Sequence, residues 1–206
     1  MDTLVYSITE EQTDTLYINL TNSCTNNCKF CIRTHKSDVC GHEMHLAQRH
    51  TVEDIINQFK NFGTPKTVVF CGYGEPTLEL DLLKGFARYL RKNYPEIKIR
   101  VNTNGHANCI YKRNIVDELK GLVDEFSVSL NASNEEDYVM ISQPKVPNAY
   151  KEVRDFIKSC VDADINTTAS VVSGYENFNP NIEECNKIAN ELGAKLKVRE
   201  YILNGY

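Results

Sequence analysis

The chain has 206 residues, a formal net charge of −5, 41% apolar residues and 25% charged residues. This composition is ordinary for a globular protein and is sufficient for one domain with a substantial core. The acidic balance gives no general support to nucleic-acid binding. No stretch approaches the roughly 20 apolar residues of a transmembrane helix, and the N-terminal segment MDTLVYSITEEQ lacks the basic region of an export signal. We therefore expect a cytoplasmic protein with no membrane partner.

Six short apolar runs typical of β-strands alternate along the chain with amphipathic helical patterns. The strand-like runs cover residues 15–20, 67–71, 97–102, 126–130, 165–172 and 196–201, and the helical patterns cover residues 51–62, 81–94, 150–162 and 181–192. Thr51 and Asn181 are the expected N-caps of two helices. The alternation predicts βα units and a parallel sheet. It does not decide whether helices cover one face of a curled sheet or both faces of a doubly wound one.

Three cysteines, Cys24, Cys28 and Cys31, follow the first strand with the spacing CxxxCxxC. In the reducing cytosol, closely spaced cysteines bind metal more often than they form disulfides. Three thiolates can hold three corners of a cubic iron–sulfur cluster and leave one iron open for another ligand. Zinc is the alternative, because His35 could complete a Cys3His site.

The second and third strands end in loops rich in glycine and small polar residues. The second strand runs into CGYGEPT and the third ends in NTNG. The positions of interest are Gly72, Tyr73, Gly74, Glu75, Thr103 and Asn104. Glycine lets backbone carbonyls approach a ligand closely, although Asn-Gly is also a common turn dipeptide. We expect these loops to lie together, because functional residues gather at the C-terminal ends of parallel strands.

Small polar residues end the fourth strand. Alternation puts Ser127, Ser129 and Asn131 on one side of this strand, opposite Val128 and Leu130. If the apolar pair faces the helices, the polar set points into the curved sheet. An exposed sheet edge is the alternative reading.

The last two strands carry Val172 and Arg199. Val172 belongs to ASVVSGYE, into which the fifth strand runs, and Arg199 belongs to VREY at the end of the sixth strand. A guanidinium at this place could bind a carboxylate in bidentate fashion. A surface salt bridge is the alternative.

Together these motifs resemble the radical S-adenosylmethionine (SAM) superfamily. CGYGEPT resembles its GGEP motif with Tyr73 in place of the first glycine, and ASVVSGYE is similar to its GxIxGxxE pattern with Ala169 and Ser173 in place of glycines. The chain is most similar to the short radical SAM proteins associated with TatD-family nucleases, over residues 16–201. The resemblance implies an α/β fold in which residues 1–206 form a single core domain. This domain would be a partial (β/α)6 barrel with parallel strands and outer helices.

The resemblance also implies two cofactors. Cys24, Cys28 and Cys31 would hold a 4Fe-4S cluster, and SAM would bind its fourth iron. The implied SAM contacts are Phe30, Gly72, Tyr73, Gly74, Glu75, Thr103, Asn104, Ser129, Asn131, Val172 and Arg199. An external one-electron donor of the flavodoxin or ferredoxin type would drive cleavage of SAM to methionine and a 5′-deoxyadenosyl radical, which abstracts hydrogen from a substrate.

The implied function is an oxidoreductase or lyase whose own catalytic residues the sequence does not identify. A small-molecule substrate is favoured, because the acidic chain shows no separate substrate domain. A functional link to a TatD-family nuclease is a further expectation from the resemblance. The alternative function is a non-catalytic iron–sulfur or zinc binding module, which would need no SAM pocket.

Overall fold

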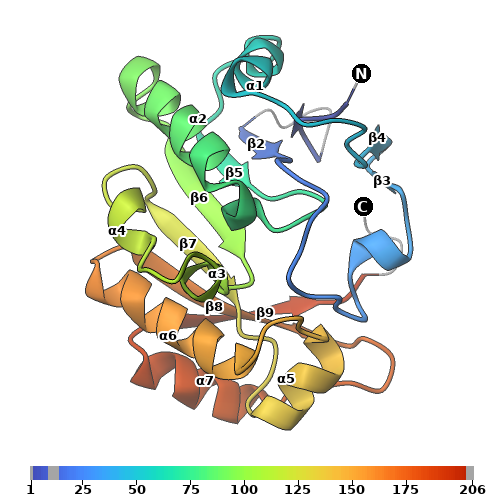
Figure 1. Cartoon of the computed structure of the whole chain (residues 1–206). Coiled ribbons are helices and arrows are strands. Elements are labelled where there is room, and N and C mark those ends of the chain that lie inside the picture. The colour runs from blue at the N-terminus through green and yellow to red at the C-terminus, as the bar shows by residue number, and fades with distance from the viewer. Residues whose placement is uncertain (1, 9–13, 203–206) are drawn as a thin grey trace.

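A computed structural model describes residues 2–8 and 14–202 of the chain (Figure 1). Its centre is a seven-stranded sheet in the order β1-β2-β5-β6-β7-β8-β9. The strands are β1 (Val5–Tyr6), β2 (Thr15–Ile18), β5 (Thr67–Phe70), β6 (Lys98–Thr103), β7 (Glu125–Ser129), β8 (Asn166–Ser173) and β9 (Lys195–Glu200). The pairs from β2 to β9 are parallel, and β1 pairs antiparallel with β2. These six parallel strands confirm the six strand predictions.

Helices and short elements connect the strands. They are η1 (Ile32–Thr34), the hairpin of β3 (Asp38–Val39) and β4 (His42–Glu43), α1 (Val52–Phe59), η2 (Pro76–Glu79), α2 (Leu80–Asn93), α3 (Ala107–Tyr111), α4 (Val116–Leu119), α5 (Glu135–Ser142), α6 (Ala149–Asp162) and α7 (Ile182–Glu191). Thr51 and Asn181 cap α1 and α7 as predicted, each accepting a hydrogen bond from a backbone N–H in the first turn. The sequence analysis missed β1, β3, β4, α3, α4 and α5.

The strand order decides the architecture that the sequence left open. The parallel strands follow one another across the sheet in chain order, so every crossover steps in the same direction. Right-handed crossovers then place the helices on one face of the sheet. In Figure 1, α2, α4 and α6 lie along the left side of the sheet, and the chain after β2 lies on the right. The α/β prediction is confirmed, and a partial barrel is consistent with this topology.

Alternation along the strands separates an apolar face from a polar one. Ile18, Phe70, Val101 and Val128 are fully buried in the core that the helices cover. Phe126 packs edge-on against Phe156 of α6, with ring centroids 5.6 Å apart. Because successive side chains of a strand point to opposite faces, the intervening residues line the concave face. The functional side chains come from this second set.

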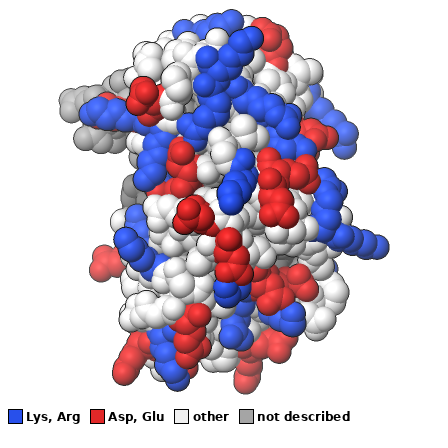
Figure 2. All heavy atoms as spheres, turned by 90° about the vertical axis from the view of Figure 1, so that its left-hand side faces the viewer, with Lys and Arg blue, Asp and Glu red and all other residues white. Residues whose placement is uncertain are grey.

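The outer surface carries mixed charge. Figure 2 shows Lys and Arg interspersed with Asp and Glu over the helical side of the molecule, among the residues that the structure describes. None of the described helices combines the length and the apolar character needed to cross a bilayer.

A close backbone contact joins β5 to the segment after β2. A Cβ atom on Gly74 would lie 2.4 Å from the carbonyl oxygens of both Thr21 and Ser23. The backbone N–H of Glu75 donates to the same Ser23 oxygen at 2.8 Å. Only a residue without Cβ permits this approach, so Gly74 determines where the chain enters the cysteine loop, residues 21–36.

A buried histidine joins the same loop to α5. His106 is 1% exposed, and its Nδ1 and Nε2 atoms lie 3.0 Å from the hydroxyls of Thr25 and Tyr138. Asn26 also donates to the Tyr138 hydroxyl, at 3.4 Å. Burial lowers the pKa of His106 to about 4, so the imidazole is neutral at pH 7.

We predict that Gly74→Ala disturbs the cysteine loop. The added methyl group forces the two backbone segments apart, which should cost about 1 to 3 kcal/mol of stability, or roughly 2 to 12 °C in Tm. Gly63→Ala is the matched control, because its Cβ meets nothing within 4 Å. Thermal unfolding of both variants measures the difference. Equal melting temperatures for the two variants would contradict this account of Gly74.

We also predict a pH-dependent contribution of His106 to stability. Its folded pKa, about 4, lies below the unfolded value of 6.5, so the unfolded chain binds the proton more readily. The contribution is complete above pH 6.5 and is lost as the pH falls toward 4. Between pH 7.5 and 5 the loss should reach about 2 kcal/mol. His106→Gln should reduce this slope by that amount, whereas exposed His45→Gln should retain it. Chemical unfolding of the three proteins at several pH values checks the prediction, and identical slopes would refute it.

Candidate functional site

The three predicted cysteine ligands lie on the cysteine loop as free, half-buried thiols. The Cys31 backbone N–H donates to the Cys28 carbonyl at 3.0 Å, and the Asn26 N–H donates to the Cys24 sulfur at 3.4 Å. Burial is the main cause of two pKa shifts. It raises the pKa of Cys24, and it raises the pKa of Cys28 to about 12. Without metal, the Cys24 and Cys28 thiols therefore keep their protons at neutral pH, and metal binding would release those protons.

Two predicted SAM contacts reach the cysteines through hydrogen bonds. The Asn104 side-chain N–H donates to the Thr25 hydroxyl at 2.7 Å and approaches the Cys24 sulfur at 3.6 Å. The Asn131 side-chain N–H donates to the Ser142 hydroxyl at 2.9 Å, and the Ser142 side chain lowers the pKa of Cys28 against the effect of burial. Hydrogen bonds to ligating sulfurs tune iron–sulfur centres. The TNG and SLN motifs therefore support the cysteine loop.

Glu75 is the centre of a buried network. Its Oε1 atom accepts from the Thr77 backbone N–H at 3.1 Å, the Thr77 hydroxyl at 2.6 Å and the Thr103 hydroxyl at 2.7 Å. Its Oε2 atom accepts from the Asn104 backbone N–H at 2.7 Å. Burial raises the pKa of this carboxyl group, and the hydrogen bonds act against the rise. Protein donors thus occupy both oxygens of Glu75, and Thr103 uses its hydroxyl in the same network.

The side chains of Tyr73 and Arg33 donate hydrogen bonds to backbone carbonyls of the cysteine loop. The Tyr73 hydroxyl donates to the Lys36 carbonyl at 2.8 Å, and its backbone N–H donates to the Asn19 side-chain oxygen at 3.0 Å. The Arg33 guanidinium donates to the carbonyls of Asn22 at 2.9 Å and Asn26 at 3.3 Å, on either side of Cys24. Arg33 was not among the predicted site residues, and its only sequence signal is its place two residues after the third cysteine.

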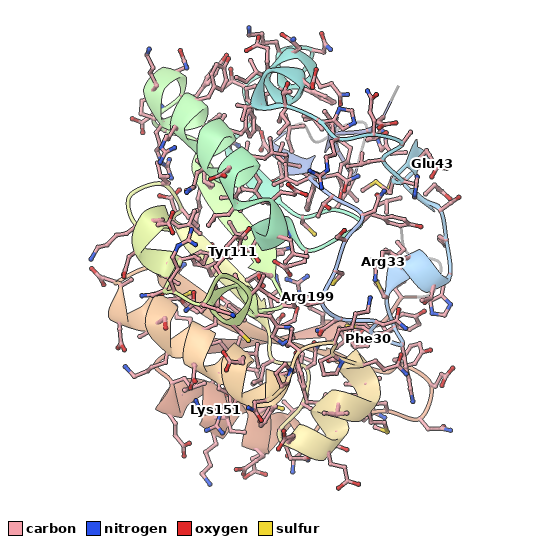
Figure 3. All side chains as sticks on the ribbon, in the orientation of Figure 1. Phe30, Arg33, Glu43, Tyr111, Lys151 and Arg199 are labelled. Carbon is pink, nitrogen blue, oxygen red and sulfur yellow. The ribbon has the colours of Figure 1, made fainter. Side chains whose placement is uncertain are left out.

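A pocket of about 240 Å³ lies between the cysteine loop and the ends of β8 and β9. Its lining includes Phe30 from the loop, Val172 from β8 and Arg199 from β9, three of the predicted SAM contacts. Phe30 packs against Tyr175 with ring centroids 6.3 Å apart. Figure 3 shows Phe30 and Arg33 on the loop, with Arg199 near the middle of the molecule. The pocket combines an aromatic face, an apolar wall and a guanidinium.

The predicted polar residues of β7 lie on the concave face. Ser127 is buried and accepts a hydrogen bond from Arg199 at 2.9 Å. Ser129 is half-buried at the end of the same strand. Because β7 pairs with both β6 and β8, the reading of these serines as an exposed edge is wrong. The alternative of a surface salt bridge for Arg199 also fails among the described residues, where no carboxylate pairs with it.

The arrangement of the donor side chains distinguishes between the two metal centres that the sequence allows. Over the described ranges, 2–8 and 14–202, no three His, Cys, Asp or Glu side chains converge as the ligands of one metal ion would. His35, the fourth ligand of the zinc alternative, lies 3.1 Å from the Lys29 carbonyl through its Nε2 atom. A cluster binds each thiolate through a different iron, so its ligands need not converge. Three thiols on one loop beside a polar concave face therefore fit a cluster with an open iron.

Similar solved structures share this fold. Streptococcus suis SuiB bound to S-adenosylmethionine aligns with a TM-score of 0.68 and 17% identity, over 93% of this chain and 41% of that chain. A radical SAM methyltransferase from Sphaerobacter thermophilus aligns with a TM-score of 0.58 and 15% identity, over 95% and 68% of the two chains. The protein anSMEcpe with bound AdoMet aligns with a TM-score of 0.65 and 17% identity, over 90% and 49%. The chain thus spans about two fifths of the length of SuiB.

No curated protein sequence gives a significant match. Residues 18–190, by contrast, match the profile of the radical SAM superfamily. Members of this superfamily are enzymes that use a 4Fe-4S cluster and SAM, which confirms the predicted enzyme class and cofactors at the level of the family. With the match extending from β2 through most of α7, the chain belongs to the radical SAM superfamily.

Proposed function

We propose that the protein is a radical SAM enzyme that acts on a small molecule. The main support for this proposal is that the cysteine loop lies next to a pocket at the strand ends. Phe30, Val172 and Arg199 line this pocket. When bound, the cluster and SAM would supply reductive cleavage to a 5′-deoxyadenosyl radical that removes hydrogen from the substrate. The remaining task of the protein is to bind, orient and shield these groups.

The residues divide into ligands, contacts and positioning groups. Cys24, Cys28 and Cys31 would hold the cluster. Phe30 and Val172 would contact the SAM adenine, since an aromatic face and an apolar wall suit a flat base. The backbone of residues 72–74 and the Ser129 side chain are the remaining direct contacts. Glu75, Thr103, Asn104 and Asn131 would act as positioning residues, because their polar atoms already pair with other parts of the protein.

The wider assignments rest on resemblance. We propose that the chain belongs to the TatD-associated group, that residues 1–206 form one core domain, and that the protein works in the cytoplasm. An external flavodoxin or ferredoxin would supply the electron. SuiB has been solved with its precursor peptide SuiA, so a peptide is the second substrate class to consider. The net reaction would be that of an oxidoreductase or a lyase.

Anaerobic reconstitution tests the cluster. The wild-type protein should take up about four irons and four sulfides per chain, and Cys24→Ala, Cys28→Ala and Cys31→Ala should each lose them, because three ligands are the minimum set. Cys40→Ala, at an exposed thiol, is the matched control and should retain the wild-type content. Iron, sulfide and zinc analyses give the measurement. Stoichiometric zinc without iron uptake would support the binding-module alternative.

Reductive cleavage tests the activity. The reconstituted protein with SAM and a strong reductant should form 5′-deoxyadenosine slowly even without substrate. Phe30→Ala should weaken SAM binding about tenfold or more, because base–aromatic stacking contributes about 1 to 3 kcal/mol. Phe62→Ala, a partly buried phenylalanine of the helical layer, is the control and should keep wild-type SAM affinity. A protein that assembles its cluster and binds SAM but never yields 5′-deoxyadenosine would sink the enzyme proposal.

A further inference from the structure

The concave face carries a second group of polar residues beside the pocket. Arg100 and Asn102 lie two residues apart on β6 and share one face of that strand. Asn102 is the register partner of Ser127 on β7. Arg199, on β9, reaches across β8 to donate to the Ser127 hydroxyl at 2.9 Å. Residues from three strands therefore meet on the floor of the curved sheet.

The group contains buried polar atoms without partners. The Nε atoms of Arg100 and Arg199 and the Oδ1 atom of Asn102 are buried and form no hydrogen bond. No carboxylate of the described residues pairs with either arginine, and the adjacent Glu125 pairs with Lys98 at 2.8 Å. Unpaired buried polar groups are unfavourable, so each needs a partner that protein atoms do not supply.

The surroundings of Cys71 show that these side chains converge. Burial raises the pKa of the Cys71 thiol, while a hydrogen bond from Asn102 and the positive charges of Arg199 and Arg100 oppose that rise. The strand geometry agrees with this: Asn102 lies opposite Ser127, the hydrogen-bond partner of Arg199, and Arg100 lies two residues from Asn102 on the same face. Two guanidinium groups near the same point repel each other unless an anion lies between them.

The arginine on the outer layer provides a contrast. Arg154 of α6 also has a buried Nε without a hydrogen bond, but its guanidinium stacks over the Tyr150 ring at 5.7 Å. Its guanidinium therefore has an aromatic partner. An unpartnered Nε alone does not define an anion site, whereas two guanidinium groups on one concave surface do.

We infer that Arg100 and Arg199 bind the oxyanion of the substrate, a carboxylate or a phosphate on a small molecule. This inference rests on the proposed function and specifies the substrate class. Arginine presents a planar fork of N–H donors that matches the oxygens of both groups. Arg199 also lines the Phe30 pocket, so the oxyanion would lie next to the space assigned to SAM. The net charge of −5 makes non-specific anion binding unfavourable, which makes a local site easier to detect.

Titration calorimetry with two simple anions tests the site in the reconstituted, SAM-loaded protein. Inorganic phosphate and acetate are the probes, at constant ionic strength set with chloride. We expect one of them to bind saturably. Arg100→Gln and Arg199→Gln should each weaken binding about ten- to hundredfold, as expected for lost hydrogen bonds to a charged group. Arg154→Gln, which removes the same charge from the outer layer, should bind as the wild type does. The anion that binds identifies the substrate group as phosphate or carboxylate.

Each outcome decides the inference. Weakening in both concave-face variants but not in Arg154→Gln supports it. Equal affinities in all four proteins, equal weakening in all three variants, or no binding of either anion overturns it. Arg100→Lys keeps the positive charge but lacks the planar fork of donors, so its anion affinity should be intermediate. This variant tests the inference if Arg100→Gln has a lowered melting temperature. Loss of SAM affinity in Arg100→Gln would show that the pair serves the SAM carboxylate and would overturn the inference.

The proposed function has a separate readout. Formation of 5′-deoxyadenosine by the wild-type protein without anion tests the radical SAM chemistry alone. If that product forms and the anion data are negative, only the anion site fails. If the product is absent and the anion data are positive, the site stands and the proposed chemistry fails.

Discussion

The buried carboxylate of Glu75 connects the parts of the chain on which the site depends. It lies after β5 and accepts hydrogen bonds from its own turn and from Thr103 and Asn104 at the end of β6. Its backbone N–H donates to Ser23 of the cysteine loop, next to the tight contact at Gly74. A charged group at this depth is tolerated only where such donors surround it. The turn, the strand end and the loop are therefore positioned together.

The same arrangement extends outward to the cysteines. Asn104 continues from Glu75 to Thr25 and Cys24, and His106 continues from Thr25 to Tyr138 of α5. Asn131 donates separately to Ser142 of α5, whose side chain influences the pKa of Cys28. The loop that carries the thiols is held by backbone hydrogen bonds from Asn27 and Lys29 to the end of α5. It is also held by side chains that follow β6 and β7, those of Asn104, His106 and Asn131. A substitution at any of these residues can therefore move the thiols without replacing one of them.

The two faces of the sheet differ in polarity, and the site lies on the polar face. One set of strand residues is apolar and packs under the helices, and the alternate set is polar and faces the cavity. The cysteine loop, the pocket and the arginine cluster all lie on this second side, at or near the strand ends. Because of this alternation, a chain of ordinary composition has an apolar core on one face of a single sheet and a charged concave surface on the other face.

Much of this was determined by the sequence alone. The periodicity of 2 and of 3.6 located six strands and four helices, and the CxxxCxxC spacing predicts the cluster ligands, because these signals lie in neighbouring residues. The sequence did not locate β1 or α5. β1 has two residues, and α5 buries Tyr138 and Ile141 while exposing Val139 and Met140, so its apolar residues occupy opposite faces.

Only the tertiary structure decided what the polar residues do. Strand order put the crossover helices α2, α4 and α6 on one face of the sheet, which left the other face for the cysteine loop and the pocket. Glu75 and Asn131 were predicted as SAM contacts, but folding brought protein partners to their polar atoms. Arg100 belongs to no motif, and it gains significance only because β6 and β9 present it and Arg199 on the same concave face. Local patterns specify elements, whereas partners for buried charges come from residues far apart in the chain, and only the folded sheet brings those residues together.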